Sequence, residues 1–192
     1  QGLFDVPLLQ SLPNTTVYSP ATYEEINSAL YSAFYKDSGL IVIRYPRGSE
    51  PDEAKGLPVP DEVDLFGDAA ASTAIVTYGR LFFNALRAQE LLAERGINVK
   101  TVKLARIKPL PERTFEFLDG CNNVFFFEEG MKGGGVGERL GSELLEKGFK
   151  GGYTVTAVDN EFVAHASVGR QLEKYSLSAE GMTAVIEKQV KR

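Results

Sequence analysis

Apolar strand-like runs alternate with helical segments through the second half of the chain, and this alternation constrains the fold more than any other feature. The expected strands cover residues 73–78, 99–104, 123–127 and 153–158. Apolar residues recur at helical spacing between them, as in the helix expected from Leu81, which Gly96 closes as a C′ glycine. Strands and helices that alternate in this way predict an α/β fold with a mostly parallel, doubly wound sheet.

A smaller strand–helix–strand unit comes before this region. Val17-Tyr18 predicts a short strand that ends at Pro20, and Leu40–Ile43 predicts a second one. Between them, Thr22 and Glu25 form a capping box for a helix. The apolar face expected on that helix consists of Ile26, Ala29, Leu30, Ala33 and Phe34. The short connection favours a parallel pair of strands, so we expect a β-α-β remnant of a second α/β domain.

The stretch that joins the two regions is polar and rich in proline. It reads as an interdomain linker with an edge strand near its end. We therefore expect the tail of one domain at 1–48, a linker at 49–67 and a complete second domain at 68–192.

Composition excludes several classes of function. A net charge of −5 and a pI near 5.1 argue against a nucleic-acid module, which would show a basic face. No apolar run approaches the roughly 18 residues of a membrane span, and no signal peptide is visible. The single cysteine, Cys121, excludes an internal disulfide, and its position favours a small packed residue. The single histidine, His165, makes a His-based metal site implausible.

Two arginines follow the second predicted strand, in Arg44-Tyr-Pro-Arg-Gly48. Ligands of open α/β sheets are usually met at the carboxyl ends of strands, and a guanidinium matches phosphate or carboxylate oxygens. Arg44 and Arg47 are therefore candidates for anion binding. From the local pattern alone, a surface ion pair with an acidic residue is the favoured alternative.

The glycine-rich loop Gly133–Gly137 stands before a predicted helix and suggests a phosphate site, but it matches neither G-x-G-x-x-G nor a P-loop. Close backbone packing, or a helix N-terminus satisfied by Glu128 and Glu129, is the favoured alternative. A pair of catalytic carboxylates is disfavoured because adjacent strand residues point to opposite faces. His165 follows the last predicted strand, where a packing or capping role is favoured over a site role.

Taken together, the motifs resemble a known family, the 1-deoxy-D-xylulose 5-phosphate synthases of the transketolase superfamily, in their carboxyl-terminal part. The resemblance covers nearly the whole chain, and the order and spacing of the motifs carry it. The motifs are Gln1-Gly-Leu-Phe-Asp5, Arg44-Tyr-Pro-Arg-Gly48, Ile107-Lys-Pro-Leu110, Glu128-Glu-Gly130, Gly133–Gly137, Phe162-Val-x-His165 and Ala179-Glu-Gly-Met182.

The resemblance implies that residues 1–48 end a pyrimidine-binding domain and that residues 68–192 form a transketolase C-terminal domain. It implies that Arg47 binds the phosphate of glyceraldehyde 3-phosphate, with Arg44 and Tyr45 in support. Gln1, Asp5 and His165 would lie beside the site, and no catalytic residue would lie in this chain.

The resemblance further implies an enzyme that joins pyruvate to glyceraldehyde 3-phosphate with loss of CO₂, as a homodimer in the cytoplasm or the plastid stroma. Thiamine diphosphate and Mg²⁺ would be bound by parts upstream, with no cofactor or metal expected on this chain. Two alternatives stay open. One is a non-catalytic assembly module, and the other is the equivalent part of a transketolase or of a 2-oxo acid dehydrogenase E1 β subunit.

Overall fold

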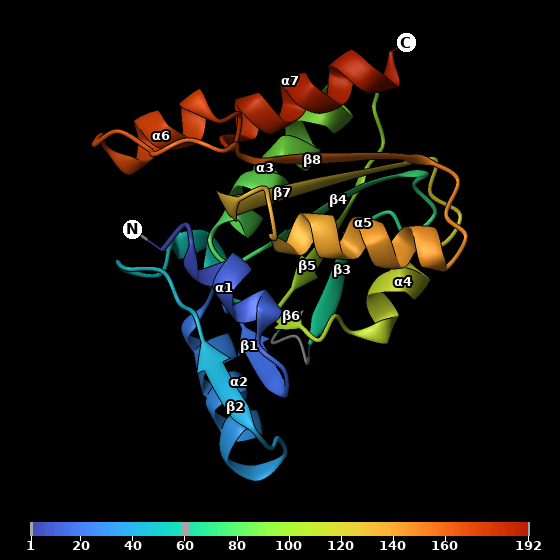
Figure 1. Cartoon of the computed structure of the whole chain (residues 1–192). Coiled ribbons are helices and arrows are strands. Elements are labelled where there is room, and N and C mark those ends of the chain that lie inside the picture. Colours follow the sequence, from blue (N-terminus) through green and yellow to red (C-terminus); the bar gives the residue numbers. More distant parts are fainter. Residues whose placement is uncertain (1, 59–61, 192) are drawn as a thin grey trace.

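A computed structural model describes residues 2–58 and 62–191, which form two sheets and the helices that cover them (Figure 1). The larger sheet has the order β3-β5-β4-β7-β8. Its strands are β3 (Val63–Gly67), β4 (Thr73–Tyr78), β5 (Lys100–Leu104), β7 (Asn123–Met131) and β8 (Gly152–Val158). All neighbours pair in parallel except β3, which pairs antiparallel with β5 at the edge. The predicted α/β fold with a mostly parallel sheet is therefore confirmed.

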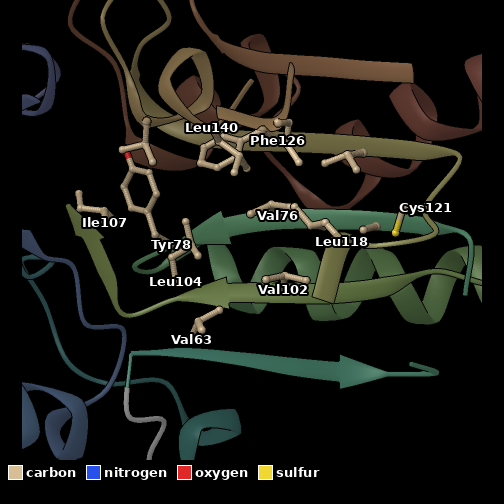
Figure 2. Packing of buried hydrophobic residues seen from close by; sticks show 14 of the residues in the cluster. Val63, Val76, Tyr78, Val102, Leu104, Ile107, Leu118, Cys121, Phe126 and Leu140 are labelled. Atoms are coloured by element: carbon tan, nitrogen blue, oxygen red, sulfur yellow. The ribbon is translucent and has the colours of Figure 1, made fainter. Parts of the chain in front are cut away.

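Helices cover both faces of this sheet, and the residues of β7 show why. Val124 and Phe126 belong to one apolar cluster, and Phe125 and Phe127 belong to another, because successive strand side chains point to opposite faces. Helices α4 (Glu112–Leu118) and α5 (Val136–Glu146) cover the first cluster, shown in Figure 2. Helices α3 (Leu81–Glu94) and α7 (Ala179–Val190) cover the second, and α6 (Val168–Lys174) precedes α7.

The smaller sheet has the order β2-β1-β6. Strands β1 (Thr15–Tyr18) and β2 (Leu40–Ile43) run parallel with α2 (Tyr23–Tyr35) between them, which confirms the expected β-α-β unit. The sequence did not predict β6 (Arg106–Lys108), which directly follows β5 and pairs antiparallel with β1. This short strand attaches the amino-terminal unit to the larger sheet.

The stretch expected to be a linker contains a 3₁₀ turn, η1 (Asp52–Ala54), and the edge strand β3. An edge strand was expected near the end of this stretch, and β3 confirms it. The boundaries that we placed at 48/49 and 67/68 stay predictions.

Helix α1 (Asp5–Ser11) was not predicted, because three prolines break up the first twenty residues. Pro7 lies in the first turn of α1, where a missing N–H costs no intrahelical hydrogen bond. The carbonyl end of α1 is satisfied from β6, since Nζ of Lys108 donates to the carbonyl oxygens of Leu9 at 2.8 Å and Gln10 at 2.9 Å, and to that of Leu12. This contact holds α1 against the smaller sheet.

Helix α2 departs from the expected burial. Of the five apolar residues predicted for its buried face, only Ala29 is buried, while Leu30 is 41% exposed and Phe34 is 78% exposed. The buried residues of α2 are instead Glu25, Ala29 and Ser32, a narrow stripe. A three-stranded sheet offers α2 less surface than the apolar face of the helix could cover, and that leaves Phe34 in contact with solvent.

Candidate functional site

The carboxyl ends of strands from both sheets meet at one place. The N–H of Gly79, after β4, donates to the carbonyl oxygen of Ser19, after β1, at 3.2 Å. The N–H of Arg44, after β2, donates to the carbonyl oxygen of Tyr18 at 2.8 Å. Parallel strands bring polar residues together at this edge, which is where an open α/β sheet forms a binding site.

Arg44 is engaged in this junction. Its Nε donates to Oδ2 of Asp5 at 2.9 Å, and its Nη2 donates to the carbonyl oxygens of Gly2 at 3.0 Å and Glu129 at 3.4 Å. The guanidinium also lies 6.0 Å from the ring centre of Tyr78. Arg44 therefore connects the start of α1 to the end of β7. Its ion pair with Asp5 is the kind of contact that the local sequence pattern favoured.

Arg47 is exposed and lines a pocket of about 640 Å³. This pocket lies between the start of α2, the segment after β2 and the start of α3. We call it the strand-end pocket, and its lining includes Tyr23, Tyr45, Arg47, Glu50, Arg80 and Phe83. The structure thus brings Arg47 and Tyr45 together on one pocket and leaves Arg44 to the neighbouring junction.

Arg80 is a functional candidate that the sequence analysis missed. Its Nε donates to Oε2 of Glu129 at 2.6 Å, and its Nη2 donates to Oε1 of the same carboxylate. The rule that singled out Arg44 could also have found Arg80, which follows the strand 73–78 and Gly79. The sequence alone gave no sign of its pairing with Glu129, 49 residues away.

The glycine-rich loop has a structural role. Glu128 is buried, and its carboxylate accepts hydrogen bonds from the N–H groups of Val136 and Gly137, both at 3.1 Å, and from the Tyr78 hydroxyl at 3.0 Å. A Cβ on Gly135 would lie 2.4 Å from Oε1 of Glu128. The N-terminus of α5 is thus occupied by the Glu128 carboxyl group, as the favoured alternative predicted for this residue. Glu129, which was predicted to lie there as well, pairs with Arg80 instead.

The remaining candidate residues lie in different places. Gln1 falls outside the described residues. Asp5 starts α1 and pairs with Arg44. His165 is exposed on the segment between β8 and α6, and it is not among the described residues that line the strand-end pocket.

Within 2–58 and 62–191, no group of three or more His, Cys, Asp or Glu side chains is arranged to hold a metal ion. In the same part of the chain, no helix is both long and apolar enough to cross a membrane.

The family described as "Transketolase, C-terminal domain" matches residues 68–182, more than half of the chain. The chain belongs to this family. The match includes β4, β5, β7 and β8 and the helices α3, α4 and α5 between them, and it starts just after β3. The transketolase C-terminal domain family therefore accounts for most of the larger sheet.

Similarity to complete proteins extends over nearly the whole chain. The 1-deoxy-D-xylulose-5-phosphate synthase of Lysinibacillus sphaericus (strain C3-41) is 30% identical over 195 residues, which cover 96% of this chain. The synthase of Listeria innocua is 31% identical over 97% of this chain. In both cases the chain spans 30% of the length of the relative.

Solved structures support the same fold. A structure described as "Split gene transketolase, inactive beta4 tetramer" superposes with a TM-score of 0.76 at 26% identity, covering all of this chain and 63% of the other. A transketolase from Pichia stipitis superposes with a TM-score of 0.77 at 18% identity and shows the shared fold alone.

Proposed function

We propose that this chain is the carboxyl-terminal part of a thiamine-diphosphate-dependent 1-deoxy-D-xylulose 5-phosphate synthase. Such an enzyme condenses pyruvate with glyceraldehyde 3-phosphate and releases CO₂. The observation that carries the proposal is the similarity to such synthases at about 30% identity along almost the whole chain, the amino-terminal unit included. A transketolase C-terminal domain by itself would leave that unit unexplained.

In this proposal, the strand-end pocket holds the phosphate of glyceraldehyde 3-phosphate. Arg47 is its exposed cation, and a guanidinium donates two parallel hydrogen bonds to phosphate oxygens. Tyr45 lies two residues before it on the same pocket. Arg44 supports the site indirectly, because it fixes the end of β2 against Asp5 and Glu129. These residues bind and orient a substrate, and we assign none of them a step in bond formation.

The described residues do not fit thiamine diphosphate and Mg²⁺. They offer no group of ligands for a metal, and Glu128 occupies the N-terminus of α5, where a diphosphate could otherwise bind. We therefore propose that other parts of the protein bind the cofactor. Calorimetric titration of this chain with thiamine diphosphate and Mg²⁺ should show no binding, and tight binding would overturn this division of labour.

The proposed activity is tested by assaying the protein that carries this chain together with the cofactor-binding part. With pyruvate and glyceraldehyde 3-phosphate, we expect CO₂ release and formation of 1-deoxy-D-xylulose 5-phosphate. If that protein instead transfers a two-carbon unit from a ketose phosphate, the equivalent part of a transketolase is the correct assignment. Decarboxylation coupled to a lipoyl acceptor would favour a 2-oxo acid dehydrogenase.

A second candidate function is that of an assembly module, and the exposed face of α2 favours it. Phe34 and Tyr35 are 78% and 76% exposed. Tyr31 is 56% exposed, and its ring centre lies 5.0 Å from that of Tyr35. Apolar surface gathered in one place on a soluble domain commonly marks an interface. The occupant that we propose is a second copy of this chain, since the split-gene relative is described as a tetramer of its β chain.

Sedimentation equilibrium tests this second candidate. The wild-type chain should form oligomers, and Phe34→Glu should shift it to monomers because a buried carboxylate would have no partner. Phe162→Glu is a matched control, since Phe162 is 90% exposed and belongs to the segment between β8 and α6. Figure 1 shows α6 and α2 at opposite ends of the molecule. A wild-type chain that stays monomeric, or equal effects of both variants, would remove the candidate.

A further inference from the structure

We infer that Arg80 is a second phosphate-binding guanidinium of the strand-end pocket and acts together with Arg47. This inference rests on the proposed function, in which Arg47 binds a phosphate. It adds a residue from a different strand end and assigns Glu129 the task of orienting it.

The backbone places Arg80 at the meeting point of the two sheets. Strand β4 lies between β5 and β7 and is buried along its whole length, so its carboxyl end has a fixed position. Gly79 then turns the chain with a φ of 58°, a conformation that favours glycine, and its N–H is held by the carbonyl of Ser19. Arg80 follows at once, as the residue before α3. Its side chain therefore starts from a rigid element.

Glu129 holds the guanidinium of Arg80 in one orientation. The two hydrogen bonds, from Nε and Nη2, use one edge of the planar group. A guanidinium has five N–H donors, so the Nη1 edge keeps its donors available. Arg80 lines the strand-end pocket, whereas Glu129 is not among the described lining residues. In the site that we infer, the edge of the Arg80 guanidinium that Glu129 leaves available is the one that binds the phosphate.

Glu129 is itself well placed for this task. It belongs to β7, and its carbonyl oxygen accepts from Nη2 of Arg44 at 3.4 Å. The side chains of Arg80 and Glu129 are 33% and 26% exposed, so water screens the pair only in part. An arginine that is oriented before the ligand arrives loses less rotamer entropy on binding.

The chemistry of the pocket suits a small phosphate monoester. Arg47 and Arg80 come from two different segments and contribute two guanidinium groups. Among the described lining residues Glu50 carries the one carboxylate, and Glu129 pairs with Arg80 from outside the lining. Two guanidinium groups can each donate a pair of hydrogen bonds to different oxygens of one phosphate dianion. The pocket volume of about 640 Å³ lies in the range typical of small-molecule sites.

The test is a titration of the 192-residue chain with inorganic phosphate, followed by NMR of its backbone amides and arginine Nε–H groups. The variants are Arg47→Gln and Arg80→Lys. Arg80→Lys keeps the positive charge but loses the paired N–H donors of the guanidinium group. Arg87→Lys is the matched control, because Arg87 is an exposed residue of α3 that pairs with Glu90. Thermal melts of each variant show whether it is folded as the wild type is.

We expect both Arg47→Gln and Arg80→Lys to weaken phosphate binding at least about fivefold, which corresponds to the loss of part of one charge-assisted contact, while Arg87→Lys has no effect. If only Arg47→Gln weakens binding, the inference about Arg80 fails and the proposed role of Arg47 stands. If only Arg80→Lys does, the role of Arg47 fails and with it the paired site. Absence of saturable binding below about 100 mM phosphate overturns both.

Discussion

Replacing Glu25 with alanine should cost about 3 kcal/mol of the free energy of unfolding, the lower end for breaking a buried ion pair. Glu25 and Lys103 form an ion pair with side chains that are 2% and 1% exposed, so neither charge is screened by water. The second oxygen of Glu25 accepts from the N–H of Ala21 at 2.7 Å. The loss is at the lower end because Asp64 lies opposite Lys103 in the β3–β5 ladder.

The effect of Glu25→Ala should depend on pH. Burial lowers the pKa of Lys103 to about 7, and removal of Glu25 takes away a charge that favours the ammonium form. That value of about 7 belongs to the protein with Glu25 in place, and the pKa of Lys103 should fall below it in the variant. At pH 6 the folded wild type then binds more protons than the folded variant, whereas at pH 9 Lys103 is uncharged in both. The variant therefore gains more stability than wild type between these two pH values. Urea unfolding at pH 6 and pH 9 measures this, and the deficit relative to wild type should be smaller at pH 9.

Two further variants sharpen the experiment. Glu24→Ala changes the neighbouring carboxylate, which is exposed, and should stay within about 0.5 kcal/mol of wild type. The double variant Glu25→Leu with Lys103→Met should recover most of the stability, because apolar residues of similar size often replace a buried pair without loss. Equal effects of Glu24→Ala and Glu25→Ala would contradict the ion pair as the contact that joins α2 to the larger sheet.

Replacing Glu128 with alanine should cost about 3 kcal/mol at pH 5, because three buried donors lose their acceptor. Burial raises the pKa of Glu128 to about 7, against the lowering effect of its hydrogen bonds. The folded protein therefore binds more protons than the unfolded chain between about pH 4.5 and 7, so this group contributes stability at pH 5 that is lost as pH rises through 7. The full change is of the order of 3 kcal/mol.

Glu128→Gln separates the charge from the shape. The amide resembles the protonated carboxyl group, so the variant should lack the loss of stability that wild type shows between pH 5 and 8. Urea unfolding at these two pH values measures it, with Glu146→Gln at the exposed far end of α5 as the control. A variant with the same pH dependence as wild type would contradict the raised pKa of Glu128.

Local patterns were enough to predict the larger sheet and the β-α-β unit. The apolar runs of β4 and β7 are buried on both faces, and such runs predict strands without knowledge of their partners. The contact of Glu128 with the glycine-rich loop could also be predicted, because Glu128 stands close to the loop in the sequence, although Glu129 pairs with Arg80 instead. These features depend on residues that are close together in the chain.

The features that were missed depend on residues far apart. Glu25 and Lys103 are 78 positions apart, and nothing near either one reveals the ion pair. Strand β6 pairs with β1, and Lys108 binds the carbonyl end of α1 across 96 to 99 residues of sequence. Arg44 and Arg47 look alike in sequence, and only the position of Asp5 separates a structural arginine from one that lines a pocket.

The most direct test of our account is the kinetics of Arg47→Ala in the protein that carries this chain with its cofactor-binding part. The variant loses a charge-assisted contact of about 1.5–3 kcal/mol. We therefore expect the KM for glyceraldehyde 3-phosphate to rise about 10- to 100-fold, while the KM for pyruvate stays within about twofold and Arg87→Ala behaves as wild type. An unchanged KM for glyceraldehyde 3-phosphate, or equal rises for both substrates, would contradict the phosphate site at the strand ends.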